Sequence, residues 1–89
     1  MNFQEEPNRF FLMENEKLAG EVTFTNAGET MFIIDHTFVD DQFRGQGIAQ
    51  KLVELVVQKA RNENKKIMPL CPFAKGEFER KPEYADVLN

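Results

Sequence analysis

The first third of the chain carries two strand patterns, a short apolar run around Phe10–Met13 and an alternation of apolar and polar residues over Leu18–Thr25. The two predicted strands, Arg9–Glu14 and Leu18–Thr25, flank the polar segment Glu14–Lys17, which suits a tight turn. A second turn signal follows at Asn26–Gly28. The pattern therefore predicts an antiparallel meander, and the polar residues 1–8 are expected to form a loose lead-in.

The strongest strand pattern covers Thr30–Val39, where apolar residues occupy both alternating sets of positions. A strand that is apolar on both faces is expected to lie in the centre of a sheet with both faces covered. The alternation predicts that one face carries Phe32, Ile34, His36 and Phe38, and that the other carries Met31, Ile33, Asp35, Thr37 and Val39.

The spacing changes to that of a helix after the polar loop Asp40–Gln46. Apolar residues three and four apart predict an amphipathic helix over Gly47–Asn62. The apolar run Lys66–Cys71 then predicts a strand parallel to the central one, because a strand, a helix and a strand in succession form a βαβ unit. A short last helix is predicted over Phe73–Arg80, and residues 82–89 carry no clear pattern.

These elements predict an α/β (α+β) fold, a mixed sheet of four or five strands with the main helix packed on one side. The length of 89 residues predicts one domain, residues 1–89, with a modest core. The net charge of −4 argues against general nucleic-acid binding, which needs an excess of Lys and Arg. Cys71 is the only cysteine, so an intrachain disulfide is excluded. Without a signal peptide or an apolar run of about 18 residues, a cytoplasmic protein with no membrane contact is expected.

The polar loop joins the end of a predicted parallel strand to the start of a helix, which is where α/β sheets bind ligands. A helix start offers unpaired N–H groups and a positive dipole end, and both favour a phosphate. Gly45 and Gly47 would let the backbone approach that phosphate closely, although a glycine-rich turn can also simply begin a helix. The loop lacks the P-loop string G-x-x-x-x-G-K-[ST]. It also lacks the third glycine of the dinucleotide fingerprint, since Gln50 stands there.

The loop Gln42–Gly47 reads Gln-Phe-Arg-Gly-Gln-Gly and matches Q/R-x-x-G-x-G/A. This is the acetyl-CoA motif of the GNAT N-acetyltransferase superfamily, which the chain resembles from about Thr30 to Phe73. Two further stretches, His36–Val39 and Cys71–Lys75, resemble the very short YjdJ-type branch. The resemblance implies a truncated GNAT-like fold with acetyl-CoA as acyl donor and no metal.

The resemblance also implies where coenzyme A is held. Main-chain N–H groups from about Arg44 to Ala49, which belong to the glycine loop Gln42–Gly47 and the first helical turn, would bind the diphosphate. The pantetheine would lie in a wedge where the strand ending at Val39 parts from the strand ending at Cys71, and Pro69 suits either a departing strand or an ordinary edge position. An N–H group near Phe38 or Val39 would polarise the thioester carbonyl. The residues implied in binding are Phe38, Val39, Arg44, Gly45, Gln46, Gly47, Ile48, Ala49 and Phe73.

The sequence departs from the usual GNAT pattern in regions that help to shape the acceptor pocket. Only Glu14–Lys17 separates the first two predicted strands, where the family usually has a pair of helices. The sequence ends at Asn89, where the family usually continues into further strands. Acyl-CoA binding is therefore better supported than a particular acceptor.

Three residues are candidates for the chemistry, each with a structural alternative. His36, the only histidine, suits a general base near neutral pH, or it is a packed histidine with one structural hydrogen bond. Cys71 precedes Pro72 and is predicted to cap the last helix, where a thiolate is favoured. It would act as a nucleophile or as a proton donor to the CoA thiolate, or it is a small buried hydrophobe. Tyr84, the only tyrosine, would be the general acid by resemblance, or it is a packing residue.

Other charged residues are weaker candidates. Arg44 and Lys75 could meet CoA phosphates, or they are ordinary surface cations. One histidine and one cysteine do not make a metal set. The cluster Glu77, Glu79, Arg80 and Lys81 is expected to form a solvated charged face.

The sequence as a whole predicts an acetyl-CoA-dependent N-acetyltransferase acting on a small-molecule or exposed protein amine. Two alternatives stay open: a non-catalytic module that binds or senses acyl-CoA, and an acyl carrier through Cys71. A monomer or a weak homodimer is expected.

Overall fold

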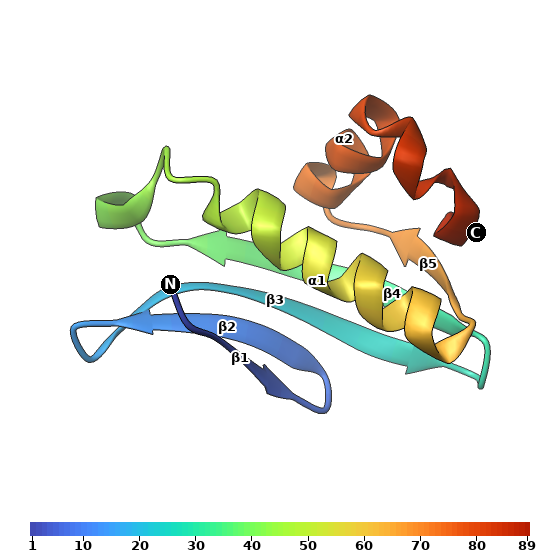
Figure 1. Ribbon diagram of the computed structural model, residues 1–89, viewed down its shortest axis with the longest axis horizontal. Helices are drawn as coiled ribbons and strands as arrows, with labels where there is room; N and C mark the ends of the chain where they lie inside the picture. Colours follow the sequence, from blue (N-terminus) through green and yellow to red (C-terminus); the bar gives the residue numbers. More distant parts are fainter.

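Five strands form one mixed sheet whose spatial order follows the chain, β1-β2-β3-β4-β5 (Figure 1). The computed structural model describes the whole chain, residues 1–89. The first four strands pair antiparallel, and β5 pairs parallel to β4, so the predicted mixed α/β fold is confirmed. The strands are β1 (Phe3–Glu6), β2 (Arg9–Glu14), β3 (Lys17–Ala27), β4 (Met31–Val39) and β5 (Lys66–Pro69). The helices are α1 (Ile48–Glu63) and α2 (Pro72–Arg80), with short 3₁₀ helices η1 (Asp41–Phe43) and η2 (Pro82–Val87).

A two-residue turn joins β2 to β3, as the polar segment predicted. Its central residues Asn15 and Glu16 both have positive φ, 51° and 62°. Two successive positive φ values characterise the type I′ turn, whose twist matches that of the flanking strands.

The prediction of a loose lead-in over residues 1–8 was wrong, because this segment forms β1. β1 pairs antiparallel with β2, with Phe3 opposite Leu12. Phe3 packs against the core, and Glu5 forms an ion pair of 3.0 Å with Lys59 of α1. The strand is held by these distant partners rather than by its own polar sequence.

One face of the sheet is covered by helices, and together they enclose the core. α1 lies across the sheet, and α2 lies beside it next to β5 (Figure 1). Neither helix combines the length and the apolar composition that crossing a lipid bilayer requires. The core includes Phe24 and Phe32 from the sheet, whose ring centroids are 5.0 Å apart. α1 contributes Ile48, Leu52, Val53, Val56, Val57 and Ala60 to it, and the C-terminal segments contribute Cys71, Ala74, Phe78, Tyr84 and Val87.

A β-bulge in β4 overturns the predicted alternation of its side chains. Phe24 pairs with Ile34 but Thr23 pairs with His36, which leaves Asp35 as an extra residue. An extra residue moves the side chains that follow it to the opposite face. Phe32 and Ile34 are therefore buried under the helices, whereas His36 and Phe38 are exposed on the open face of the sheet. The prediction that both faces of this strand are covered was wrong as well.

The last residues of the chain, which carried no clear pattern, pack along α1 and β5. η2 buries Tyr84 and Val87, and Leu88 forms a parallel bridge with Ile67 of β5. The guanidinium of Arg61 binds both carboxylate oxygens of Asp86, each at 2.9 Å. These contacts attach the C-terminal segment to elements that precede it in the chain.

Glu77 is buried, contrary to the prediction that it belongs to a solvated charged face. Only 1% of its surface is exposed. Arg80 donates a hydrogen bond to Oε2, and Lys81 Nζ lies 2.9 Å from Oε1 in an ion pair that lacks hydrogen-bond alignment. Burial raises the pKa of the Glu77 carboxyl, but Lys81 and Arg80 outweigh burial, so that its pKa lies below the ordinary value of 4.5.

Glu77→Gln is expected to lower stability at pH 7 by about 1 kcal/mol, a modest figure because Arg80 stays largely hydrated. A carboxyl whose pKa is lowered by folding stabilises the native state above its ordinary pKa. That stabilisation is lost as pH falls through the lower native value. The difference in Tm between wild type and variant should therefore shrink between pH 5 and about pH 3. The exposed Glu79, changed to Gln on the same helix, is the matched control. A Tm difference for Glu77→Gln that is the same at pH 7 and pH 3 would contradict the ion-pair explanation.

Candidate functional site

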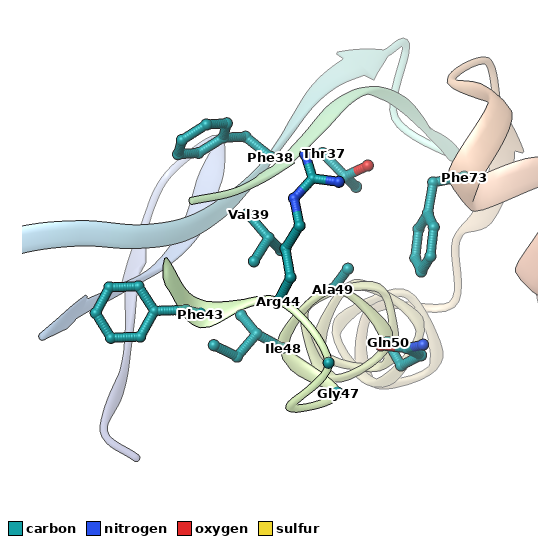
Figure 2. Close-up of a pocket in the computed structure, with 11 residues that line it drawn as sticks. Thr37, Phe38, Val39, Phe43, Arg44, Gly47, Ile48, Ala49, Gln50 and Phe73 are labelled. Atoms are coloured by element: carbon teal, nitrogen blue, oxygen red, sulfur yellow. The ribbon is translucent and has the colours of Figure 1, made fainter. Parts of the chain in front are cut away.

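A cavity of about 460 Å³ lies where the end of β4, the glycine loop, the first turn of α1 and Phe73 of α2 meet (Figure 2). Its wall combines apolar side chains with main-chain groups of the loop. Figure 2 shows the Arg44 side chain extending over the cavity, and Arg44 Nε is 2.8 Å from Asp41 Oδ1. The lining residues are Thr37, Phe38, Val39, Phe43, Arg44, Gly45, Gly47, Ile48, Ala49, Gln50 and Phe73.

At two positions of the glycine loop, the backbone has a left-handed conformation that glycine adopts more readily than other residues. Gly45 has φ of 82°, and Gly47, the N-cap of α1, has φ of 78°. A Cβ on either would meet nothing within 4 Å, so it is the backbone conformation that requires glycine there.

The start of α1 leaves its first amides without partners. Gly47 has no side chain to cap the helix, and the first intrahelical bond is Lys51 N to Gly47 O at 3.0 Å. The N–H groups of Ile48, Ala49 and Gln50 precede that bond, and all three residues line the cavity. Unpaired amides at the positive end of a helix dipole suit a diphosphate, so the residues present fit the nucleotide end of coenzyme A.

β4 and β5 separate beside this cavity. Their last pair is Ile34 with Pro69, and Leu70 N donates to Ile34 O at 3.0 Å. On its other side, β4 stays paired with β3 as far as Gly20 and Val39, and Asp40 N donates to Ala19 O at 2.8 Å. In that register the N–H and C=O groups of Phe38 face β3. The N–H and C=O groups of Thr37 and Val39 face the opposite side, toward the gap left by β5.

Pro69 occupies an ordinary edge position. Leu70 N faces β4, and Ile67 O faces the opposite edge, where it accepts from Asn89 N at 2.9 Å. The nitrogen of Pro69 therefore points to the outer edge, where its missing N–H removes no bond to β4. Of the two readings left open by the sequence, the edge position accounts for this proline.

Cys71 is the N-cap of α2, with Pro72 in the first turn, as predicted. Its Sγ accepts from Ala74 N at 3.4 Å and lies 3.7 Å from Thr37 Oγ1. The residue is 9% exposed and packs with the core. It adjoins the cavity through two lining residues, Thr37 and Phe73.

The structure does not bring His36 and Tyr84 to this cavity. His36 lies on the open face, with Nε2 3.9 Å from Glu21 Oε2. Tyr84 packs against Phe78 at a ring distance of 5.5 Å, and burial raises the pKa of its hydroxyl. It lines a second hollow of about 450 Å³ beside α1, which also includes Gly47 and Gln50.

A comparison with protein-family models matches residues 9–87 to the family of GCN5-related N-acetyl-transferases. The chain belongs to this family. No protein with a curated description matches the sequence. The family match covers β2 through η2 and therefore includes every residue that lines the cavity.

Solved structures agree with the family and its fold. The solution structure of a GCN5-like protein from Staphylococcus aureus is 34% identical, with a TM-score of 0.83 over 99% of this chain and 87% of that one. A ribosomal-protein-alanine N-acetyltransferase from Brucella melitensis biovar Abortus 2308 is 22% identical, with a TM-score of 0.64 over 84% of this chain and 58% of that one. The N-acetylglutamate synthase of Neisseria gonorrhoeae, complexed with coenzyme A and N-acetyl-glutamate, is 20% identical, with a TM-score of 0.66 over 82% of this chain and 18% of that one. The GCN5-related fold is thus present here in a chain much shorter than the last two proteins.

Sequence reasoning missed Thr37, Phe43 and Gln50 among the residues that line the cavity, and Gln46, which it included, lies outside the lining. Gln50 belongs to the first turn of α1, so the predicted helix start was a usable signal for it. Thr37 had no such signal, because its direction depends on the bulge at Asp35.

Proposed function

We propose that this chain binds acetyl-CoA in the cavity between β4, the glycine loop and α2, and transfers the acetyl group to an amine. The observation that carries the proposal is the set of unpaired amides at Ile48, Ala49 and Gln50, three residues that line the cavity beside the gap between β4 and β5. Family membership and the coenzyme A complex of the Neisseria protein support acetyl-CoA as the donor.

The glycine loop is the proposed diphosphate site. Gly45 and Gly47 have positive φ, no side chain caps α1, and residues of its first turn line the cavity, so the first amides of α1 would be available to the diphosphate. Arg44 would add one positive charge over the cavity. The apolar walls formed by Val39, Ile48 and Phe73 would exclude water from the pantetheine arm.

The gap between β4 and β5 is the proposed position of the thioester. The register directs the N–H group of Val39 into this gap and the N–H group of Phe38 toward β3. We therefore assign Val39 N–H, rather than Phe38 N–H, as the donor that stabilises negative charge on the carbonyl oxygen. In direct transfer the amine nitrogen bonds to the acetyl carbon as the carbon–sulfur bond breaks. The sulfur then gains a proton and the amine loses one.

Cys71 is the proposed group beside the departing sulfur. As a proton donor it would protonate the CoA thiolate. As a nucleophile its Sγ would bond to the acetyl carbon, its proton would pass to the departing sulfur, and an amine would later take the acetyl group and return a proton to Sγ. His36 has no part in this proposal because it lies on the opposite face of the sheet, and Tyr84 has none because it lines a different hollow.

The binding proposal predicts that acetyl-CoA and CoA raise the Tm of the wild-type protein and that NAD does not. A ligand at 100 times its Kd stabilises the native state by about 2.7 kcal/mol, which raises Tm by about 10 °C or more in a domain this small. Thermal unfolding with the three compounds at equal concentration is the measurement. An equal shift with NAD, or none with acetyl-CoA, would contradict the proposal.

The transfer proposal predicts an N-acetylated product when the protein, acetyl-CoA and a panel of small amines and peptides are combined. Mass spectrometry of the amines detects it, and a reaction without protein is the control. Binding without any acetylated amine would favour a non-catalytic acyl-CoA module.

The acyl carrier through Cys71 is a second candidate, favoured by the position of Sγ at the start of α2 beside the cavity. It predicts one added acetyl group on Cys71 after incubation with acetyl-CoA alone. The absence of this adduct in intact-mass spectra of the wild type would exclude the carrier and the nucleophilic route. The YjdJ-type branch, the cytoplasmic location and the oligomeric state stay predictions of the sequence.

A further inference from the structure

The bulge at Asp35 brings the hydroxyl of Thr37 to the side of the sheet that carries the cavity. Thr37 and Phe38 both line the cavity, but their side chains extend in different directions from β4, and the ring of Phe38 lies on the side away from Phe73 (Figure 2). Thr37 is partly exposed. Thr37 Oγ1 lies 3.7 Å from Cys71 Sγ. A residue of β4 thus meets the N-cap of α2 across the gap that β5 leaves.

Cys71 Sγ has two polar neighbours, and they differ in what they can do. The Ala74 amide, at 3.4 Å, can only donate a hydrogen bond. The Thr37 hydroxyl can donate or accept, because its hydrogen rotates about the C–O bond. It can therefore accept from the S–H group of the thiol and, after the proton is lost, donate to the thiolate.

A hydrogen bond to a charged acceptor is stronger than the same bond to a neutral one. The Thr37 hydroxyl should therefore stabilise the thiolate more than the thiol, and it should keep Sγ beside the cavity. The proton released from the thiol passes to solvent.

We propose that Thr37 is a positioning residue for Cys71, whose hydroxyl stabilises the thiolate and holds Sγ at the edge of the acetyl-CoA cavity. The catalytic consequence rests on the proposed function. The stabilisation of the Cys71 thiolate is independent of the proposed function, because it requires no ligand.

No charged side chain on the neighbouring elements makes a hydrogen bond with Thr37 that its substitution would disturb. A change in Cys71 reactivity in a Thr37 variant is therefore attributed to the lost hydroxyl. On β4, Asp35 accepts a hydrogen bond from Thr25, and His36 is exposed near Glu21 on the open face. On α2, Lys75 is exposed one turn after Cys71. β5 contributes Ile67 to the core that surrounds Cys71, and the residues of α1 in the same core are the apolar set Ile48, Leu52, Val53, Val56, Val57 and Ala60.

Alkylation of the free protein by iodoacetamide tests the proposal. Cys71 is the only cysteine, so the label reports on this sulfur alone. The rate is measured from pH 6 to pH 10 for wild type, Thr37→Val and Thr37→Ser. Valine keeps the shape of threonine without the hydroxyl, and serine keeps the hydroxyl.

Thr37→Val is expected to react about three- to tenfold more slowly than wild type at pH 7.5 and to approach the wild-type rate at pH 10. Thr37→Ser is expected to follow the wild-type profile. A purely steric change of access would scale the rate equally at every pH. If Thr37→Val does not fold, Thr37→Ala provides the same comparison.

Identical profiles for wild type and the variant without the hydroxyl would overturn the role of Thr37. Acetyl-CoA binding is measured separately by the thermal shift of the wild type. If the alkylation profile depends on the Thr37 hydroxyl but acetyl-CoA does not raise the Tm, the role of Thr37 stands and the proposed function is rejected. If acetyl-CoA raises the Tm but the alkylation profile does not depend on the hydroxyl, the proposed function stands and the role of Thr37 is rejected.

Discussion

Gly47→Val is expected to lower the affinity for acetyl-CoA by about 100-fold, because a β-branched residue is strongly disfavoured in the left-handed conformation that Gly47 adopts. The φ of Gly47 is 78°, and the residue is the N-cap of α1. A change of its backbone would redirect the amides of Ile48 and Ala49, which are the proposed diphosphate donors. Isothermal titration of acetyl-CoA into the folded variant measures the loss.

Gly28→Val is the matched control for this experiment. Gly28 has φ of 70°, and a Cβ there also meets nothing within 4 Å. It lies in the turn between β3 and β4, outside the residues that line the cavity. The control should lose a similar amount of stability and keep its affinity. Wild-type affinity in Gly47→Val would show that the diphosphate is not held by this helix start.

Gly20→Ala is expected to destabilise the protein by about 2–3 kcal/mol, the cost of overpacking a tight core site. A Cβ at Gly20 would lie 2.9 Å from Ile48 Cγ2 and 3.0 Å from the Phe38 carbonyl oxygen. The oxygen belongs to the backbone of a paired strand, so it cannot move aside cheaply. A small domain has only a few kcal/mol of net stability, so a large fraction would be lost. Thermal and urea unfolding measure the change.

Gly76→Ala is the control, with the same substitution and an expected effect of the opposite sign. Gly76 lies inside α2, and its closest neighbour would be the guanidinium of Arg80 at 3.1 Å, at the end of a flexible side chain. Alanine is favoured over glycine in a helix by about 1 kcal/mol, so Tm should rise. An unchanged Tm for Gly20→Ala would contradict the close approach of α1 to β3.

The Gly20 site also connects stability to the cavity. Ile48, which a Cβ at Gly20 would displace, is the first residue of α1 and lines the cavity. If Gly20→Ala remains folded, it should bind acetyl-CoA more weakly than the Gly76→Ala control.

Most secondary structure could be predicted because its signals are local. The helix predicted over Gly47–Asn62 differs from α1 by one residue at each end, since the apolar spacing and the flanking glycine lie within the segment itself. Cys71 and Pro72 likewise marked the start of α2. The glycine loop was recognisable because positive φ and unpaired helix amides follow from residue type and from position relative to the helix.

The predictions that failed concern features that depend on residues far away in the sequence. β1 is stabilised by Leu12 and Lys59, and the burial of Glu77 depends on packing that its own charged segment does not reveal. The face reversal after Asp35 depends on how β4 pairs with β3, because strand pairing decides whether a residue is extra. The amino-acid sequence by itself determined the order of the elements from β2 to α2 and the loop that begins α1. Only the tertiary structure decided that Thr37, and not His36, faces Cys71 and the cavity, because the two strands and the helix cap that set this arrangement meet only in the folded chain.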